Sequence, residues 1–143
     1  MKSIVNSQLT GKWYQIAKTY NRYEMKFVEV LLYFSMNCRD NLDLLYVGIK
    51  KDRSKILKKI TSYIIEKDND TYIVFKGVFF VKKLKMLLYD EDSGIMILSD
   101  DKKDYLTIYS RKSSFNPIVI EKYLSTIDFY NFNNNEVKLY VVE

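Results

Sequence analysis

The side chains that could carry chemistry in this chain are carboxylates, hydroxyls, amines and one thiol, because its 143 residues include no histidine. Nucleophiles that depend on a histidine base, and metal or haem sites with histidine ligands, are therefore excluded. Cys38 is a single cysteine, so it forms no internal disulfide and has no zinc-type spacing. The acids Asp100, Asp101 and Asp104 cluster in a turn-like segment, where carboxylates are usually solvated. No nucleophile and base pair is legible, and we expect no catalytic site, metal or cofactor.

Alternation of apolar and polar residues with a period of two recurs along the chain and predicts β-strands. Thirteen tyrosines and eight phenylalanines, with one proline and four glycines, also favour strands over helices or disorder. Short polar breaks between the strands are typical of an up-and-down antiparallel sheet, and closing that sheet into a barrel removes its exposed edges. We expect one all-β domain over residues 1–143, with eight strands at 11–20, 28–37, 42–51, 56–67, 70–77, 83–90, 94–99 and 105–112.

The pattern changes after residue 112. Asn116-Pro117 is an N-cap residue followed by proline at the first helical position. Apolar residues then recur at helical spacing, which predicts a helix over about 117–128 with one side on the barrel wall. That stripe consists of Ile120, Tyr123, Leu124 and Ile127. A short alternating segment, 137–141, follows and predicts a last strand beside the first one.

Three motifs stand in a fixed order along the chain. The first strand opens with Gly11-Lys12-Trp13-Tyr14, Asp104-Tyr105 precedes the eighth strand, and Arg111 closes it. In this order, and with a helix following, the motifs resemble those of the lipocalins, closest to the bacterial lipocalins and apolipoprotein D. The resemblance covers about residues 9–142. It implies an eight-stranded cup that binds, transports or stores a small hydrophobic molecule.

The motif residues have structural roles that can be stated physically. We expect the Trp13 ring to fill the closed end of the barrel. There it would pack in the core and would not contact a ligand. Gly11 lets backbone approach there, because it has no side chain. Arg111 is predicted to lie across the Trp13 ring as a cation–π contact worth roughly 1–2 kcal/mol when shielded from water.

Inward and outward side chains alternate along every barrel strand, so setting Trp13 inward predicts what faces the cavity. The interior is then apolar with a few hydroxyls, which suits an acyl chain or a flat apolar ring. The tyrosines could bind a polar head group; the opposing interpretation is that they face solvent or fill the barrel. The predicted lining residues are Ala17, Leu32, Phe34, Leu44, Tyr46, Ser62, Ile64, Tyr72, Val74, Met86, Leu88, Met96, Thr107 and Tyr109.

Charge divides between the two predicted ends of the barrel. The loops after the first, third, fifth and seventh strands carry ten basic and five acidic residues, whereas the opposite loops carry two basic and eight acidic residues. A positive rim over an apolar cup favours an anionic amphiphile, such as a fatty acid or lysophospholipid, and would turn the mouth toward an anionic membrane. Alternatively, these are solvated loop charges. The basic rim residues are Arg22, Lys26, Lys50, Lys51, Arg53, Lys55, Lys82, Lys83, Lys102 and Lys103.

Other functions stay open from the sequence. A pI near 9.1 with many aromatic residues also fits a five-stranded OB-type barrel that binds single-stranded nucleic acid, although the lysines interleave with acids and we expect no nucleic acid. A lipocalin-fold enzyme is the other alternative. The aromatic group Phe129, Tyr130 and Phe132 would either form a dimer surface or cover the barrel. We favour the cover, and expect a monomer or weak homodimer.

The N-terminal residues suggest where the protein works. Residues 1–6 have no apolar run of the kind found in signal peptides, and no stretch approaches the ~20 apolar residues of a membrane span. With no disulfide either, we expect a cytoplasmic protein unless the first residue is a processed terminus.

Overall fold

The computed structural model describes residues 4–19, 26–127, 129–132 and 137–139. Nine strands, one α-helix and two short 3-10 helices follow one another along this part of the chain. The order is η1 (Asn6–Leu9), β1 (Gly11–Thr19), β2 (Phe27–Met36), β3 (Leu42–Lys50), β4 (Lys55–Lys67), β5 (Asp70–Lys76), β6 (Val81–Asp90), β7 (Ile95–Ser99), β8 (Leu106–Ser110), α1 (Pro117–Thr126), η3 (Phe129–Asn131) and β9 (Val137–Leu139).

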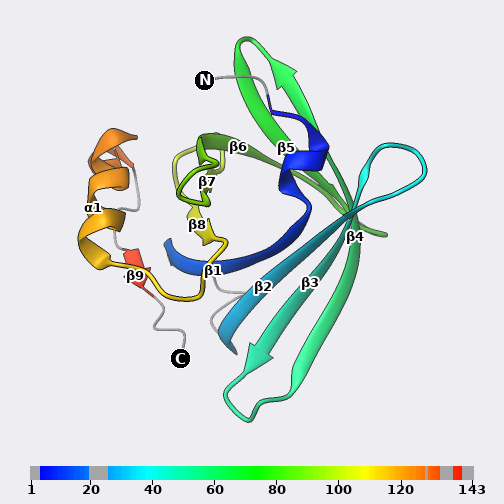
Figure 1. Ribbon diagram of the computed structural model, residues 1–143, viewed down its shortest axis with the longest axis horizontal. Helices are drawn as coiled ribbons and strands as arrows, with labels where there is room; N and C mark the ends of the chain where they lie inside the picture. The colour runs from blue at the N-terminus through cyan, green and yellow to red at the C-terminus, as the bar shows by residue number, and fades with distance from the viewer. Residues whose placement is uncertain (1–3, 20–25, 128, 133–136, 140–143) are drawn as a thin grey trace.

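The eight strands β1 to β8 form a closed antiparallel barrel, which confirms the predicted fold. Consecutive strands pair with one another from β2 through to β8. The strand β1 closes the sheet, because it pairs with both β8 and β2. Figure 1 shows these strands wrapped around a common interior, with α1 outside the barrel. The five-stranded OB-type alternative is therefore wrong about the architecture.

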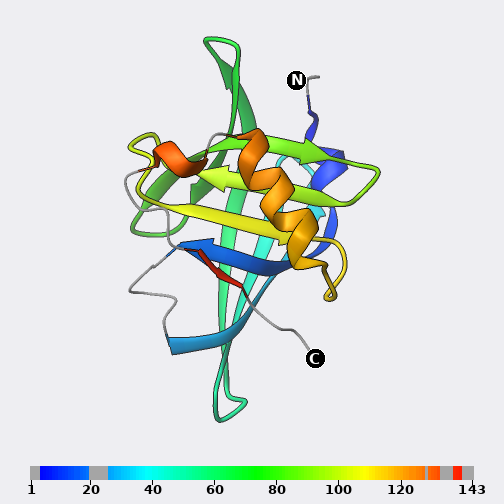
Figure 2. The same cartoon turned by 90° about the vertical axis from the view of Figure 1, so that its left-hand side faces the viewer.

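The helix α1 starts where the sequence predicts and ends two residues earlier. The Asn116 side chain accepts a hydrogen bond from the Ile118 amide at 3.0 Å, so it caps the first turn. Ile120 and Leu124 are buried against residues of β1, β7 and β8, and Figure 2 shows the helix crossing the outer face of these strands. Phe129 and Phe132 are buried in the same layer, so they pack on the barrel wall, whereas the sequence predicted that they cover the barrel's end.

The last strand, β9, pairs with β1 on the side predicted for it. Leu139 is opposite Ala17, and Val137 is opposite Thr19. The predicted extension to residues 140 and 141 lies outside the described residues. The loop basic residue Arg22 and acidic residue Glu24 also lie outside them.

The buried apolar side chains form two main layers, one inside the barrel and one between its outer wall and α1. The inner layer includes Trp13, Phe34, Met86 and Tyr109, whereas the outer layer includes Ile16 and its neighbours under α1. Alternation along the strands therefore sorts residues between a cavity side and a helix side.

Two β-bulges change that alternation and correct two of the predicted lining residues. In β1 the register shifts between Gln15 and Ala17, and Ala17 joins the outer layer. In β6 it shifts between Met86 and Leu88, and Leu88 joins the outer layer as well. A bulge inserts one extra residue, so every side chain beyond it changes face.

The predicted phase of β5 is wrong by one residue. Ile73 and Phe75 belong to the inner layer, so the alternate residues Tyr72 and Val74 face outward. The segment Thr-Tyr-Ile-Val-Phe is apolar on both faces, and its pattern therefore did not determine which face is buried.

Candidate functional site

The closed end of the barrel is built around Trp13, whose side chain is only 1% exposed. The Arg111 guanidinium carbon lies 3.9 Å from the centre of the Trp13 ring, which is the contact predicted from the sequence. The indole NH donates to the Leu9 carbonyl at 3.0 Å. Arg111 donates to the Gln8 carbonyl at 2.9 Å and to the Lys12 carbonyl at 3.3 Å. The ring and the guanidinium together hold η1 across this end.

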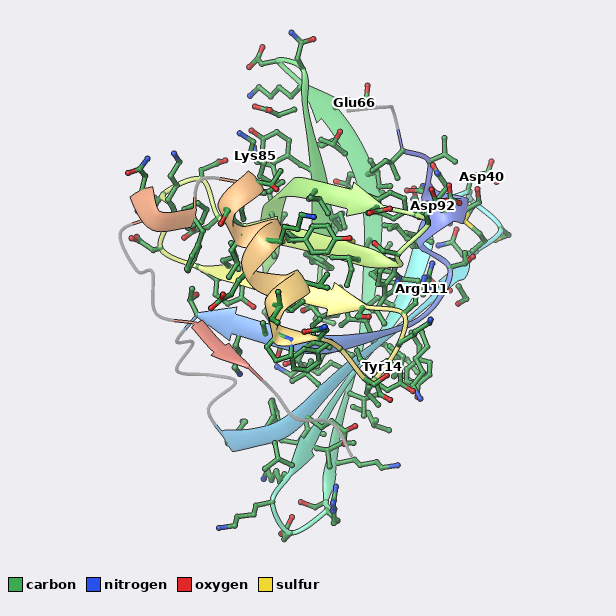
Figure 3. The ribbon with its side chains drawn as sticks, turned by 60° about the vertical axis from the view of Figure 1, so that its left-hand side comes forward. Tyr14, Asp40, Glu66, Lys85, Asp92 and Arg111 are labelled. Atoms are coloured by element: carbon green, nitrogen blue, oxygen red, sulfur yellow. The ribbon has the colours of Figure 1, made fainter. Side chains whose placement is uncertain are left out.

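Two glycines make room for Arg111. Gly11 has φ +105°, and a Cβ there would lie 3.0 Å from an Arg111 nitrogen. Gly94 has φ +68°, and a Cβ there would lie 2.8 Å from Arg111 Cγ. Partial burial lowers the pKa of Arg111, while Tyr89 beside it acts in the opposite direction. Figure 3 shows Arg111 on the same side of the molecule as the acids Asp40 and Asp92.

The motif residues Asp104 and Tyr105 lie in the turn between β7 and β8, at the opposite end. The Asp100 carboxylate accepts hydrogen bonds from the Asp104 amide at 2.9 Å and from the Tyr105 amide at 3.1 Å. Asp100 therefore stabilises the turn, which is a structural role for part of the acidic cluster. Among the described residues, no group of three or more acidic or cysteine side chains is placed to hold a metal ion.

A cavity of about 320 Å³ lies inside the mouth half of the barrel. That volume is at the lower end of the range for small-molecule sites. Its walls are mostly apolar and also include three tyrosines and two exposed lysines. The lining residues are Leu32, Leu44, Tyr46, Lys58, Ile60, Phe75, Phe80, Lys82, Leu84, Tyr105 and Tyr109.

The structure brings some of the predicted lining residues to this cavity and leaves others away from it. Leu32, Leu44, Tyr46 and Tyr109 line it. The other predicted residues with inward positions lie elsewhere in the interior: Phe34, Met86 and Met96 pack in the inner layer, Ile64 packs against it, and Ser62 and Thr107 are buried. Because of the two bulges and the phase of β5, Ala17, Tyr72, Val74 and Leu88 face outward.

Sequence reasoning placed Lys82 at the basic rim but not in the cavity lining, and it missed Lys58 at both places. Lys58 and Lys82 stand at inward positions, because they are two residues from Ile60 and Leu84 along their strands. The Lys82 ammonium lies 4.7 Å from the centre of the Tyr105 ring. Continuing the alternation past Ile60 would have found Lys58, but a lysine was not expected on an inward face.

Lys18 is a third inward lysine and is only 1% exposed. It pairs across the sheet with Thr107, which is buried and accepts a hydrogen bond from Gln15 at 2.9 Å. The bulge in β1 produces this orientation, since it turns Ala17 outward and the next residue inward. The barrel interior is therefore polar where β1 and β8 meet. These polar residues are not among those that line the 320 Å³ cavity.

One edge of β4 is unpaired beside the cavity, because β4 is longer than β5. Residues 55–60 of β4 pair with β3, whereas the pairing of β4 with β5 begins only at Thr61 opposite Lys76. Phe80 and Lys82 line the cavity together with Lys58 and Ile60 of this unpaired part of β4.

A larger hollow of about 1100 Å³ lies mainly on the outside of β2, β3 and β4. Most of its lining side chains alternate with inward ones, and they include Tyr33, Lys59 and Tyr63. Arg39 and Asp43 give it a mixed charge. The smaller interior cavity is the better candidate for a ligand site, because it has an apolar floor with polar groups gathered at one end.

Comparison with known proteins identifies the fold. No protein-family model and no curated protein sequence matches this chain. Among solved structures, lobster apocrustacyanin A1 is similar over 96% of this chain and 79% of that chain, with a TM-score of 0.69 and 21% identity.

Two further structures extend this comparison. The cockroach allergen Per a 4 matches with a TM-score of 0.68 and 18% identity, over 98% of this chain and 91% of that one. The siderocalin Ex-FABP matches with a TM-score of 0.66 and 17% identity, over 95% of each chain. These neighbours are lipocalins, so the fold is that of a lipocalin. Identities this low establish the fold alone.

Proposed function

We propose that this protein binds an anionic amphiphile, of the fatty acid or lysophospholipid type, in the barrel cavity and carries or stores it. The observation that supports the proposal is the placement of Lys58 and Lys82 at the rim of an otherwise apolar cavity. The cavity itself would hold the acyl chain.

The apolar part of the cavity has the character that an acyl chain needs. Leu32, Leu44, Ile60, Phe75 and Leu84 provide its walls. Deeper in the barrel, Met86 and Met96 pack in the inner layer. Methionine side chains adapt their shape easily, so a longer chain would extend the cavity by displacing them.

The polar groups gather where a carboxylate or phosphate would sit. Lysine ammonium groups and tyrosine hydroxyls both donate hydrogen bonds to anionic oxygens, and charge-assisted bonds are the stronger kind. Tyr105 lies beside Lys82, and Tyr46 pairs with Lys58 across β3 and β4, whereas Tyr109 lines the cavity deeper in the inner layer. This arrangement favours an anionic head group over a neutral one.

Fold comparison gives general support for a binding protein rather than an enzyme. Ex-FABP is a siderocalin that functions through dual ligand specificities, which is a property of that protein. Similar folds host different functions, so the proposal for this chain depends on its own cavity. The motifs that resemble those of bacterial lipocalins and apolipoprotein D agree with a carrier, and a monomer or weak homodimer remains our expectation.

A displacement experiment tests the head-group preference. We expect a dansyl-labelled fatty acid to bind about tenfold more tightly than the matching fatty alcohol at low salt, with the difference falling as salt rises. The K58Q/K82Q variant should bind the acid no better than the alcohol. The control K122Q changes an exposed lysine of α1 and should leave both affinities unchanged.

Three outcomes decide between the parts of the proposal. Equal affinities for the fatty acid and the fatty alcohol at low salt would contradict the proposed preference for an anionic head group. Absence of binding by both probes would contradict a ligand cavity altogether. Native mass spectrometry of freshly purified protein would identify a co-purifying amphiphile directly, and a bound lipid of neutral head group would contradict the proposed class.

A further inference from the structure

Residues 77–81, which are the loop between β5 and β6 and the first residue of β6, expose an apolar surface at the mouth of the barrel. Phe79 is 98% exposed and Val78 is 86% exposed, and Phe80 and Val81 are exposed as well. Scattered apolar side chains on a surface need no explanation, but four consecutive ones at a loop tip do.

The conformation of the loop separates its two phenylalanines. The Gly77 amide donates to the Phe80 carbonyl at 2.9 Å, which closes a tight turn. The Phe80 ring lies directly against Gly77, where a Cβ would come within 2.2 Å of it, and it also lines the cavity. Phe80 is thus folded back onto the barrel, while Val78 and Phe79 project from it.

Positive charge surrounds this apolar tip. Lys76 and Lys82 flank it in sequence; Lys59 lines the outer hollow with Val78, and Lys58 lines the cavity with Phe80. Residues 71–89 contain no acid, and neither do residues 55–65. The nearest acids on these strands, such as Asp70, lie toward the opposite end, where Asp70 pairs with Lys85 at 3.3 Å.

Acids do approach the mouth from the turn between β7 and β8, in which Asp100, Asp101 and Asp104 accompany two lysines. Asp100 is engaged by backbone amides of that turn. Asp52 lies in the turn between β3 and β4, where its carboxylate accepts hydrogen bonds from Ser54. The strands that carry the apolar loop are therefore basic near it, and the acids of the described mouth lie in these two turns.

We propose that residues 77–81 are a membrane anchor, with Val78 and Phe79 entering the interface of an anionic bilayer and the flanking lysines contacting lipid phosphates. Apolar burial combined with attraction of basic residues to anionic lipids is how peripheral proteins bind membranes. This inference rests on the proposed function in one respect: Phe80 lines the ligand cavity, so the anchor would hold that side of the cavity next to a membrane that supplies the amphiphile.

Binding to vesicles tests the anchor. We expect the protein to bind vesicles of phosphatidylcholine with about 30% phosphatidylserine, to ignore vesicles of phosphatidylcholine alone, and to be released by salt. The V78S/F79S variant should lose at least about tenfold in vesicle affinity. The matched control is I118S, which replaces a 74% exposed apolar residue on α1 and should bind as the wild type does.

A fluorescent reporter tests insertion directly. The chain has one tryptophan, Trp13, and it is buried at the closed end. An F79W variant adds an exposed one, whose emission should shift to the blue with anionic vesicles and stay unchanged with neutral ones. An unchanged emission with both, or vesicle binding by V78S/F79S equal to that of the wild type, would overturn the proposal.

Two other outcomes can be distinguished from membrane anchoring. One is contact of the loop with a second copy of this chain, and the other is failure of the proposed ligand cavity. If the loop instead contacts a second copy, the wild type would be a dimer by light scattering, V78S/F79S would be a monomer, and vesicles would bind neither, which would overturn the anchor. The dansyl fatty acid in solution should bind wild type and V78S/F79S equally. Vesicle binding without fatty acid binding would sink the cavity proposal and support the anchor.

Discussion

The two ends of this barrel are built in opposite ways. At the closed end, Trp13 is fully buried, Arg111 lies over its ring, and both donate hydrogen bonds to carbonyls of η1 or β1. At the mouth, residues 77–81 expose apolar side chains, and Lys58 and Lys82 stand at the rim of a cavity. At the closed end the polar groups of Trp13 and Arg111 are hydrogen-bonded within the protein. The mouth instead presents exposed apolar side chains and positive charge.

We infer from this difference that the closed end contributes to the stability of the fold and that the mouth contributes to binding. Tight packing and hydrogen bonds to η1 lower the free energy of the folded state, but they leave no space for a ligand. The apolar side chains at the tip of the mouth are exposed, so a partner can reach them. Substitutions at the closed end should therefore change the free energy of unfolding, and substitutions at the mouth should change binding.

The largest effect is expected for Trp13→Ala. Removing a buried tryptophan leaves a cavity and should lower the free energy of unfolding by about 3–5 kcal/mol, measured by urea denaturation. The mouth variant F79A removes a side chain that is 98% exposed and should leave the free energy of unfolding unchanged. Equal destabilisation by the two substitutions would break the comparison.

The second effect concerns the partner of Trp13. Arg111→Ala removes the cation–π contact and two hydrogen bonds to carbonyls of Gln8 and Lys12, and should cost about 2–3 kcal/mol. A double-mutant cycle with Trp13→Ala should give a coupling energy of about 1–2 kcal/mol between the two side chains. If the two costs simply add, the ring and the guanidinium do not act as a unit.

The third effect should appear in binding. Leu84→Trp places a large ring at the cavity wall, so the dansyl fatty acid should bind at least about tenfold more weakly, or about 1.4 kcal/mol. Because the ring enters existing space, the free energy of unfolding should change by less than about 1 kcal/mol. The control L57W adds the same ring on β4 at a side chain that is 60% exposed. Binding that survives L84W but not L57W would move the ligand to the outer face.

The two ends also differ in how far the sequence predicted them. The closed end carries motif residues of distinct type, so Trp13, Gly11 and Arg111 could be assigned to it before the fold was known. Strand order and the helix also followed, because period-two alternation and the Asn116-Pro117 start are strong local signals.

The mouth and the cavity were less predictable, for physical reasons. A bulge reverses the face of all later side chains in a strand, and neither bulge has a glycine or other local marker in β1 or β6. Lys82 was predicted at the rim from its place near a loop, but a rule that places apolar residues inside did not predict that Lys58 and Lys82 take inward positions on their strands. The apolar loop 77–81 falls between two strands and has no alternation to interpret.

The smallest expected effect is a pH-dependent change in the free energy of unfolding at the closed end. Asp90, the last residue of β6, has its pKa lowered chiefly by hydrogen bonds from Ser93, and Tyr123 of α1 donates to it at 3.0 Å. A lowered folded pKa contributes stability above the unfolded pKa, and that stability is lost as the pH falls through the folded pKa.

Asp90→Asn should therefore cost only about 0.5 kcal/mol at pH 7, since the carboxylate is largely in contact with solvent. The difference from wild type should shrink as the pH is lowered below 3.8, the ordinary pKa of the group. Denaturation curves at several pH values would measure it. The control Asp101→Asn removes one carboxylate from the exposed mouth turn, and its curves are measured in parallel. A gap for Asp90→Asn that persists in acid would mean that its hydrogen bonds do not depend on the charge, and that the turn is held by packing of Tyr123 instead.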